Sequence, residues 1–188
     1  MNIPTDRVIA ETRAWVQRAV VGLNLCPFAK APLAKEQIRF VVCASDDPRV
    51  LLDLLCAQMN ELVAADPARV ETTLVIHPNA LTDFDEFNDF LDAADAALED
   101  RGLAGVLQIA SFHPRYRFAD AAADDLGNAT NRSPYPTLHL LREASVERAV
   151  EAFPEAEAIY ENNIATLDAL GAEGWAQLQA QCRDDAAP

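Results

Sequence analysis

The sequence predicts a single α/β domain of the α+β kind, in which a small mixed sheet of about four strands is packed with helices. Three observations favour this fold class. Short β-branched and aromatic runs alternate with longer stretches in which apolar residues recur at helical spacing. Their order along the chain is αβαβαββα, with further helix at the C-terminus. The 188 residues, 51% of them hydrophobic, suffice for one domain spanning 1–188, and no linker divides them.

The chain is expected to begin with a helix, a loop and a strand. Helical spacing of apolar residues covers 5–23, with Thr5 or Asp6 as the N-cap. Residues 24–37 contain two prolines and no periodicity, so we expect a loop there. The β-branched and aromatic run at 38–44 predicts the first strand.

A second helix is expected to run from Pro48 to about Ala65. Proline suits a first helical turn, and Ser45 or Asp46 can accept hydrogen bonds from the free N–H groups of that turn. Its buried stripe should consist of Val50, Leu51, Leu54, Leu55, Leu62 and Val63.

Two more strands follow, separated by an acidic helix. The run at 70–78 predicts the second strand, and the helix that begins at "TDFDEF" should end at Gly102. Strands are expected over 103–114 and 137–141 with no helix between them. Strand four should therefore be antiparallel, whereas strands one to three should be parallel if they are neighbours.

The C-terminal third is helical in composition. Ser145 is expected to cap one helix, and Pro154 to start or interrupt another. Asparagine is a poor helix former, so Asn162 and Asn163 mark a break or a polar contact. Helix should continue to about Cys182, which leaves 183–188 as a frayed tail.

The net charge of −15 argues against two broad classes of binding partner, nucleic acids and membranes. An acidic surface repels phosphate backbones and anionic lipid heads, so we expect neither nucleic-acid nor membrane binding. The N-terminus shows no signal-peptide pattern, and no apolar run is long enough to span a bilayer. The four cysteines are scattered without a CxxC pair, which favours a cytoplasmic protein with reduced thiols.

The three histidines are candidate catalytic residues and metal ligands. His77 and His113 each end a strand and precede a proline, while His139 lies within strand four. If all three face the same side of the sheet, they could hold one divalent transition metal, zinc or iron, or act as general acid and base. Alternatively, each imidazole only bonds a nearby carbonyl, because no HxH or HExxH spacing is present.

Cys26, in "GLNLCPFAK", is a candidate nucleophile. It stands beside a proline in the expected loop, and Lys30 is close in sequence. The thiol would need a lowered pKa, which the preceding helix C-terminus disfavours. The alternative is a small apolar plug between the first helix and the sheet.

The long segment between strands three and four is rich in cationic and polar residues. Arginines bind carboxylates and phosphates in bidentate fashion, and connections of this length are often functional. The alternative is that Arg115, Arg117 and Arg132 pair with Asp120, Asp124 and Asp125 to tie down the loop. The expected substrate-binding residues, including one that follows strand two, are Asn79, Arg115, Tyr116, Asn131, Arg132, Ser133 and Tyr135.

Four phrases, "GLNLCPFA", "HPNALTDFDEFNDFL", "LQIASFHPRYRF" and "NRSPYPTLHLLRE", carry a family resemblance. Together they resemble a bacterial family catalogued as domain of unknown function number 1415. The likeness covers Val8 to Val150. It implies one bacterial, soluble domain and supplies no catalytic assignment.

Two functions are compatible with these features. The first is a small enzyme acting on a small anionic metabolite through a His/Arg/Tyr-lined pocket, with or without a metal. The alternative is a non-catalytic ligand-binding or protein-interaction module that uses the 113–136 loop. Composition leaves open a homodimer formed through the first helix and the C-terminal helices.

Overall fold

The computed structural model describes residues 3–152 and 158–187. Its sheet has the strand order β1-β2-β4-β3. The strands are β1 (Ile38–Val42), β2 (Thr72–Ile76), β3 (Leu107–Phe112) and β4 (Thr137–Arg142). β1 and β2 are parallel neighbours, and β4 is antiparallel to both β2 and β3. The mixed sheet and the antiparallel fourth strand are confirmed. β3 runs in the direction of β2 but does not pair with it, because β4 lies between them.

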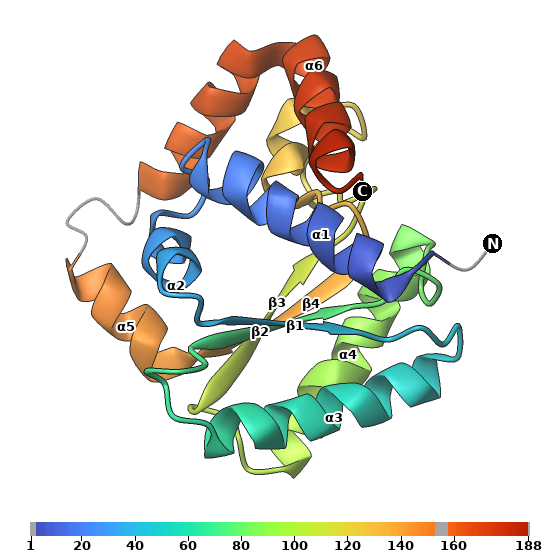
Figure 1. Cartoon of the computed structure of the whole chain (residues 1–188), viewed down its shortest axis with the longest axis vertical. Coiled ribbons are helices and arrows are strands. Elements are labelled where there is room, and N and C mark those ends of the chain that lie inside the picture. Colours follow the sequence, from blue (N-terminus) through green and yellow to red (C-terminus); the bar gives the residue numbers. More distant parts are fainter. Residues whose placement is uncertain (1–2, 153–157, 188) are drawn as a thin grey trace.

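Helices cover both faces of the sheet, as Figure 1 shows. On one face lie α3 (Pro48–Ala64) and α4 (Phe84–Asp100). On the other side are α1 (Thr5–Trp15), which continues as a π-helical turn to Val21, α2 (Lys30–Ala34) and α6 (Ile159–Asp185). α5 (Glu143–Ala152) follows β4 at one side of the molecule. No helix in the described part of the chain is both long and apolar enough to cross a membrane.

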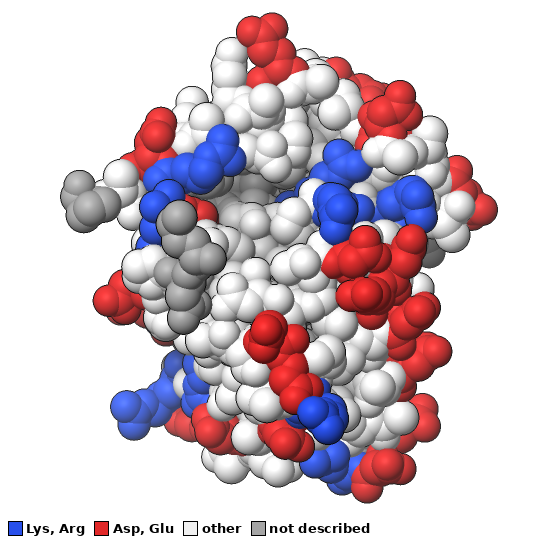
Figure 2. Space-filling model, turned by 90° about the vertical axis from the view of Figure 1, so that its right-hand side faces the viewer, with Lys and Arg blue, Asp and Glu red and all other residues white. Residues whose placement is uncertain are grey.

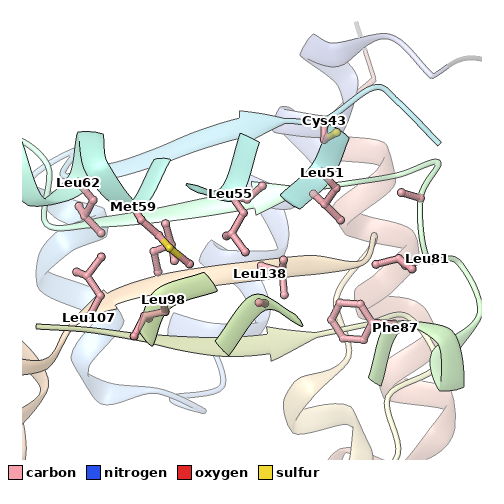
Figure 3. Close-up of a cluster of buried hydrophobic side chains, with 14 residues drawn as sticks. Cys43, Leu51, Leu55, Met59, Leu62, Leu81, Phe87, Leu98, Leu107 and Leu138 are labelled. Carbon is pink, nitrogen blue, oxygen red and sulfur yellow. The ribbon is translucent and has the colours of Figure 1, made fainter. Parts of the chain in front are cut away.

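The core beneath α3 and α4 is built mainly from leucines (Figure 3). α3 contributes Leu51, Leu55, Met59 and Leu62, which follow one helical stripe. Val50 and Val63 were expected in this stripe but are 47% and 42% exposed. They lie at the edges of the stripe, where the curved helix surface turns away from the sheet.

A second core fills the opposite face. Its members come from distant parts of the chain, so it joins the N-terminal and C-terminal helices to the sheet. The residues include Val8, Trp15, Ala19, Leu74, Ile76, Leu167 and Leu178. Trp15 packs edge-on against Phe112 of β3, with ring centroids 5.3 Å apart.

The segment 24–37 is not the loop that its prolines suggested. It contains a 3-10 turn (Pro27–Ala29) followed directly by α2. Pro27 starts the turn and Pro32 lies near the start of α2, where backbone N–H groups have no helical partner to lose. Here prolines initiate helix instead of excluding it.

Three expected helix caps are wrong. α1 begins after Pro4 with no side-chain cap, and α5 begins at Glu143, before Ser145. α3 is capped by Asp47, whose carboxylate accepts from the Arg49 N–H at 2.9 Å, and not by Ser45 or Asp46. Pro48 does occupy the first turn, as expected.

α6 bends at Gly171, where φ is +71°, and not at Asn162 or Asn163. Asn163 is buried and donates from Nδ2 to the Leu25 carbonyl at 2.9 Å, so it is a polar contact. The helix extends beyond Cys182 to Asp185, whose carboxylate accepts from Arg18 Nη2 at 2.9 Å. Pro154 lies outside the described residues.

Candidate functional site

The three histidines do not share one face of the sheet. His139 of β4 pairs with Leu74 of β2 and Ala110 of β3, so its side chain lies on the α1 side with theirs. His77 follows β2 in the phase of Val75, on the opposite side, and stacks on Phe87 of α4 with ring centroids 5.6 Å apart. The expectation of one three-imidazole surface is therefore wrong. In residues 3–152 and 158–187, no group of three or more His, Cys, Asp or Glu side chains could hold a metal ion.

His77 is fully buried and holds the turn that follows β2. Its Nδ1 donates to the Ala80 carbonyl at 3.0 Å, because a carbonyl can only accept. Nε2 is then an acceptor, and it has no partner within the described residues. Burial lowers the pKa of His77 to about 4, so the ring is neutral at physiological pH.

His113 braces the same turn from β3. Its Nδ1 accepts the Arg115 N–H at 3.0 Å, and Nε2 donates to the Leu81 carbonyl at 3.3 Å. Burial lowers its pKa as well. Leu81 has a positive φ of 52°, which is costly for a branched side chain and must be stabilised by its surroundings. The geometry of His77 and His113 favours the alternative in which these imidazoles bond nearby carbonyls.

Cys26 lines a cavity on the α1 face together with His139. Burial raises the pKa of the Cys26 thiol, against two backbone N–H groups that lower it. The thiol is therefore protonated at neutral pH, which is the opposite of the lowered pKa that a cysteine nucleophile needs. This placement favours the apolar-plug alternative.

The 113–136 loop is tied to the start of α4. Arg115 donates to the Thr82 carbonyl and lies 3.5 Å from Asp83, and Arg117 lies 3.4 Å from Asp85. These partners come from α4 and the turn before it. The carboxylates of the loop itself, which sequence reasoning offered as partners, are not used by these two arginines.

Several expected ligand-binding side chains serve the loop itself. Asn131 Nδ2 donates to the Ser111 carbonyl at 3.1 Å, and the Tyr116 ring packs edge-on against Phe84. Asn79, far from the loop in sequence, donates to the Ala44 carbonyl at 2.8 Å. Asn131 and Tyr116 therefore hold the loop in place, whereas Asn79 joins the segments that follow β1 and β2.

Arg132, Ser133 and Tyr135 lie together where the loop meets α1 and α6. A cleft of about 230 Å³ opens there. Its lining residues are Glu11, Trp15, Pro114, Arg132, Ser133, Pro134, Trp175, Leu178, Gln179, Cys182 and Arg183. On this side of the molecule, Figure 2 shows a hollow with Lys and Arg side chains gathered on both sides of it.

The negative charge of one carboxylate of the cleft is already balanced by a cation and a hydrogen-bond donor. Glu11 is 5% exposed; its Oε1 accepts from Arg7 Nε at 2.8 Å and its Oε2 from the Tyr135 hydroxyl at 2.6 Å. Burial and the neighbouring carboxylate raise the pKa of Tyr135, so the phenol keeps its proton.

One cation of the cleft lacks such compensation. Arg132 donates from Nε to the Tyr116 carbonyl at 3.2 Å and from Nη2 to the Ala123 carbonyl at 2.9 Å. Both partners are neutral, and no carboxylate of the described residues lies within ion-pairing distance. Burial lowers the pKa of Arg132, since its charge is partly removed from water, and the nearby Asp125 carboxylate opposes this with a smaller effect.

The helical half of the cleft, which comes from Glu11, Trp175 and Arg183, is not among the residues predicted from the sequence. A signal for Glu11 was present, because it is three residues after Val8 and four before Trp15, on the apolar stripe of α1. A carboxylate on a buried stripe needs a partner, and the partner is Tyr135. No local pattern marks Arg183, which joins the cleft only because α6 packs on α1.

Fold and cleft together define a mixed α/β protein with a small cleft between a long inter-strand loop and two helices. The chain belongs to the family described as protein of unknown function (DUF1415), which matches residues 7–177. This confirms the family resemblance that the four sequence phrases carry. We found no match among curated proteins or among solved structures.

Proposed function

We propose that this protein binds a small anionic metabolite in the cleft between the 113–136 loop, α1 and α6. The observation that carries the proposal is the half-buried Arg132 guanidinium, which only neutral carbonyls contact. A partly desolvated charge with no ion-pair partner is costly, because the Asp125 carboxylate offsets only part of the effect of burial on the pKa of Arg132. A bound carboxylate or phosphate would supply a direct partner.

The remaining charges of the cleft support the same ligand class. Arg183, in the last turn of α6, adds a second cation to the lining. The negative charge of Glu11 is balanced by Arg7, so the cleft is locally positive in a chain whose net charge is −15. Trp15 and Trp175 contribute apolar walls, which suit the carbon skeleton of a small organic anion.

Tryptophan fluorescence offers a direct test, because the chain has two tryptophans and both line this cleft. The protein is titrated with inorganic phosphate, succinate and benzoate at constant ionic strength. We expect a saturable fluorescence change with at least one anion, and about tenfold weaker binding in Arg132→Gln. Arg49→Gln is the matched control, since the Arg49 side chain is 90% exposed and its ion pair within the described residues is with Asp47 near the start of α3.

Two results would overturn the proposal. One is the absence of saturable binding of any of the three anions at millimolar concentration. The other is equal affinity in Arg132→Gln, Arg49→Gln and the unchanged protein.

A catalytic version of this function has one specific observation in its favour, the 2.6 Å hydrogen bond between Glu11 and Tyr135 at the cleft. The Glu11 carboxylate is the candidate base of this pair, because the raised pKa of Tyr135 keeps the phenol protonated and leaves it the role of orienting Glu11. None of the three histidines lines the cleft, so proton transfer there falls to Glu11, which does line it. NMR spectra of the best-binding anion, incubated with the protein and with Glu11→Gln, distinguish the two versions. An enzyme converts the anion and the variant does not, whereas a binding module leaves it unchanged in both.

We also place the protein in the bacterial cytoplasm as part of this proposal. Its four cysteines are free thiols, and three of them are buried as packing residues. Fractionation of a bacterial host that expresses the native chain, followed by immunoblotting, tests this location.

A further inference from the structure

A second, larger cavity lies on the α1 face of the sheet, apart from the anion cleft. Its volume is about 320 Å³, within the range of small-molecule sites. The sheet forms its floor, the π-helical turn after α1 and the 3-10 turn before α2 form two walls, and α5 closes a third side. Most of its lining is apolar and comes from Trp15, Val16, Val20, Phe28, Ala29, Pro32, Ile38, Leu74, Ala110, Phe112, Leu141, Val146 and Ala149.

The wall formed by α5 is incompletely packed. None of the residues of this helix is buried, although Ser145, Val146 and Ala149 face the cavity on successive turns. Phe112, Ile38 and Val20 are likewise only partly buried. An apolar occupant would remove this surface from water, which stabilises the complex in proportion to the area covered.

His139 supplies a polar group with a defined role at the floor of the cavity. The Thr72 hydroxyl donates its single proton to the Leu140 carbonyl at 2.6 Å, so toward His139 Nε2, also at 2.6 Å, it can only accept. Nε2 therefore carries the ring proton. Burial lowers the pKa of His139 to about 4, so Nδ1 is an unprotonated acceptor at neutral pH.

The charged residues of the lining do not favour an anion. Arg142 is the one cation among the described lining residues, and its Nη2 atom donates to the carbonyls of Leu62, Ala65 and Val70 on the α3 side of the sheet. Glu71 is the one carboxylate in the part of the lining that the structure describes. A free carboxylate in this cavity would lose its hydration and face the lone pair of His139 Nδ1.

We propose that this cavity binds a neutral, mainly apolar molecule that bears one hydroxyl group, and that the hydroxyl donates its hydrogen bond to His139 Nδ1. Aliphatic alcohols and phenols share this chemistry. The proposal does not depend on the anion cleft, because the two sites share only Trp15 in their linings.

The test compares ligands that differ only in the head group. Octanol, butylphenol and octanoate are titrated into the full chain at neutral pH by calorimetry and ligand-observed NMR. We expect saturable binding of octanol or butylphenol, and at least about tenfold weaker binding of octanoate at the site that Val146→Phe blocks. Whichever hydroxyl compound binds more tightly identifies the source of the group as aliphatic or phenolic.

Paired variants locate the site. Val146→Phe fills the cavity and should abolish octanol binding, whereas Val150→Phe, on the same helix at a 44% exposed position, should leave it unchanged. His139→Leu removes the acceptor and should weaken binding about tenfold, while His139→Asn keeps an oxygen near the Nδ1 position and should retain most of it. Circular dichroism confirms that each variant is folded.

The proposal is wrong if the octanoate binding that Val146→Phe abolishes is as tight as that of octanol, or if neither hydroxyl compound binds. Octanoate binding that Val146→Phe leaves unchanged belongs to the anion cleft. The proposal is also wrong if a folded Val146→Phe protein binds octanol like Val150→Phe, or if the two His139 variants are indistinguishable. Phosphate binding at the anion cleft is measured in parallel in the Val146 and Val150 variants. A change in phosphate affinity in these variants concerns the anion cleft alone and does not bear on the apolar cavity.

Discussion

His77 and His139 lie on opposite faces of one sheet, although they come from neighbouring strands. His77 stacks on Phe87 of α4, while the His139 ring is tilted against Phe112, 6.2 Å away, in the core below α1. The β2–β4 register, which pairs Leu74 with His139, determines this separation. The polar side chains that the sequence suggested for one site are therefore divided among three separate regions. These are the turn before α4, the apolar cavity and the anion cleft.

We expect the protein to bind no transition metal through its three histidines. Imidazole ligands must bring their nitrogens to about 2.1 Å from one ion, which is impossible across the two faces of a sheet. Protein purified without an affinity tag should contain less than about a tenth of an equivalent of zinc or iron, measured by elemental analysis. Adding either metal should leave the melting temperature unchanged. A stoichiometric metal that His139→Asn removes would contradict this expectation.

Stability should fall as the pH is lowered from 6.5 to about 4. The folded-state pKa values of His77 and His139 are about 4, below the ordinary value of 6.5, so the unfolded chain binds more protons in this window. Each histidine contributes a slope of up to about 1.4 kcal/mol per pH unit. Urea unfolding at several pH values measures the slope.

His139→Asn is the control for this pH dependence, because asparagine does not titrate. Its slope between pH 6.5 and 4 should be shallower than that of the unchanged protein, while carboxylates contribute equally to both. Parallel curves for the two proteins would show that His139 is not the group responsible.

The fold was largely predictable because its signals are local. Strand runs, the Pro48 helix start and the Gly102 helix end each depend on a few neighbouring residues, and the structure has them. The wrong predictions concern residue types that occur in two different kinds of local structure. Proline both ends and begins helices, so Pro27 suggested a loop where a helical turn starts.

The site was less predictable because it depends on long-range order. Period-two alternation correctly grouped His139 with Thr137 and His77 with Val75, but it cannot relate the faces of different strands. That relation depends on register and on the insertion of β4 between β2 and β3. The cleft likewise joins Glu11 to Tyr135, 124 residues later in the chain.

Arg142 is expected to be important for stability. Its Nη2 atom donates to the carbonyls of Leu62, Ala65 and Val70, which ties the C-terminal end of α3 to β4. Arg142→Met keeps much of the apolar stem but leaves these acceptors without the donor, and should lower the free energy of unfolding by about 2 kcal/mol. Urea unfolding measures the loss. Arg49→Met, which removes an exposed guanidinium, should change the midpoint little, and equal losses in the two variants would refute the role of Arg142.

The Tyr135–Glu11 pair should show energetic coupling. Tyr135→Phe leaves the buried Glu11 Oε2 without its donor and should cost about 1–3 kcal/mol of unfolding free energy. Glu11→Leu leaves the phenol unpartnered and should be destabilising as well. Because the double variant has neither orphaned group, its loss should be smaller than the sum of the single losses by about 0.5–3 kcal/mol.

Tyr160→Phe is the matched control for this cycle, since Tyr160 is 57% exposed. Combined with Glu11→Leu, it should give additive losses in urea unfolding followed by tryptophan fluorescence. Additive losses for Tyr135→Phe as well would mean that the 2.6 Å bond does not hold the loop to α1. Coupling at Tyr135 alone would show that this bond joins α1 to the exit of the loop, beside the Arg132 guanidinium that the proposed anion needs.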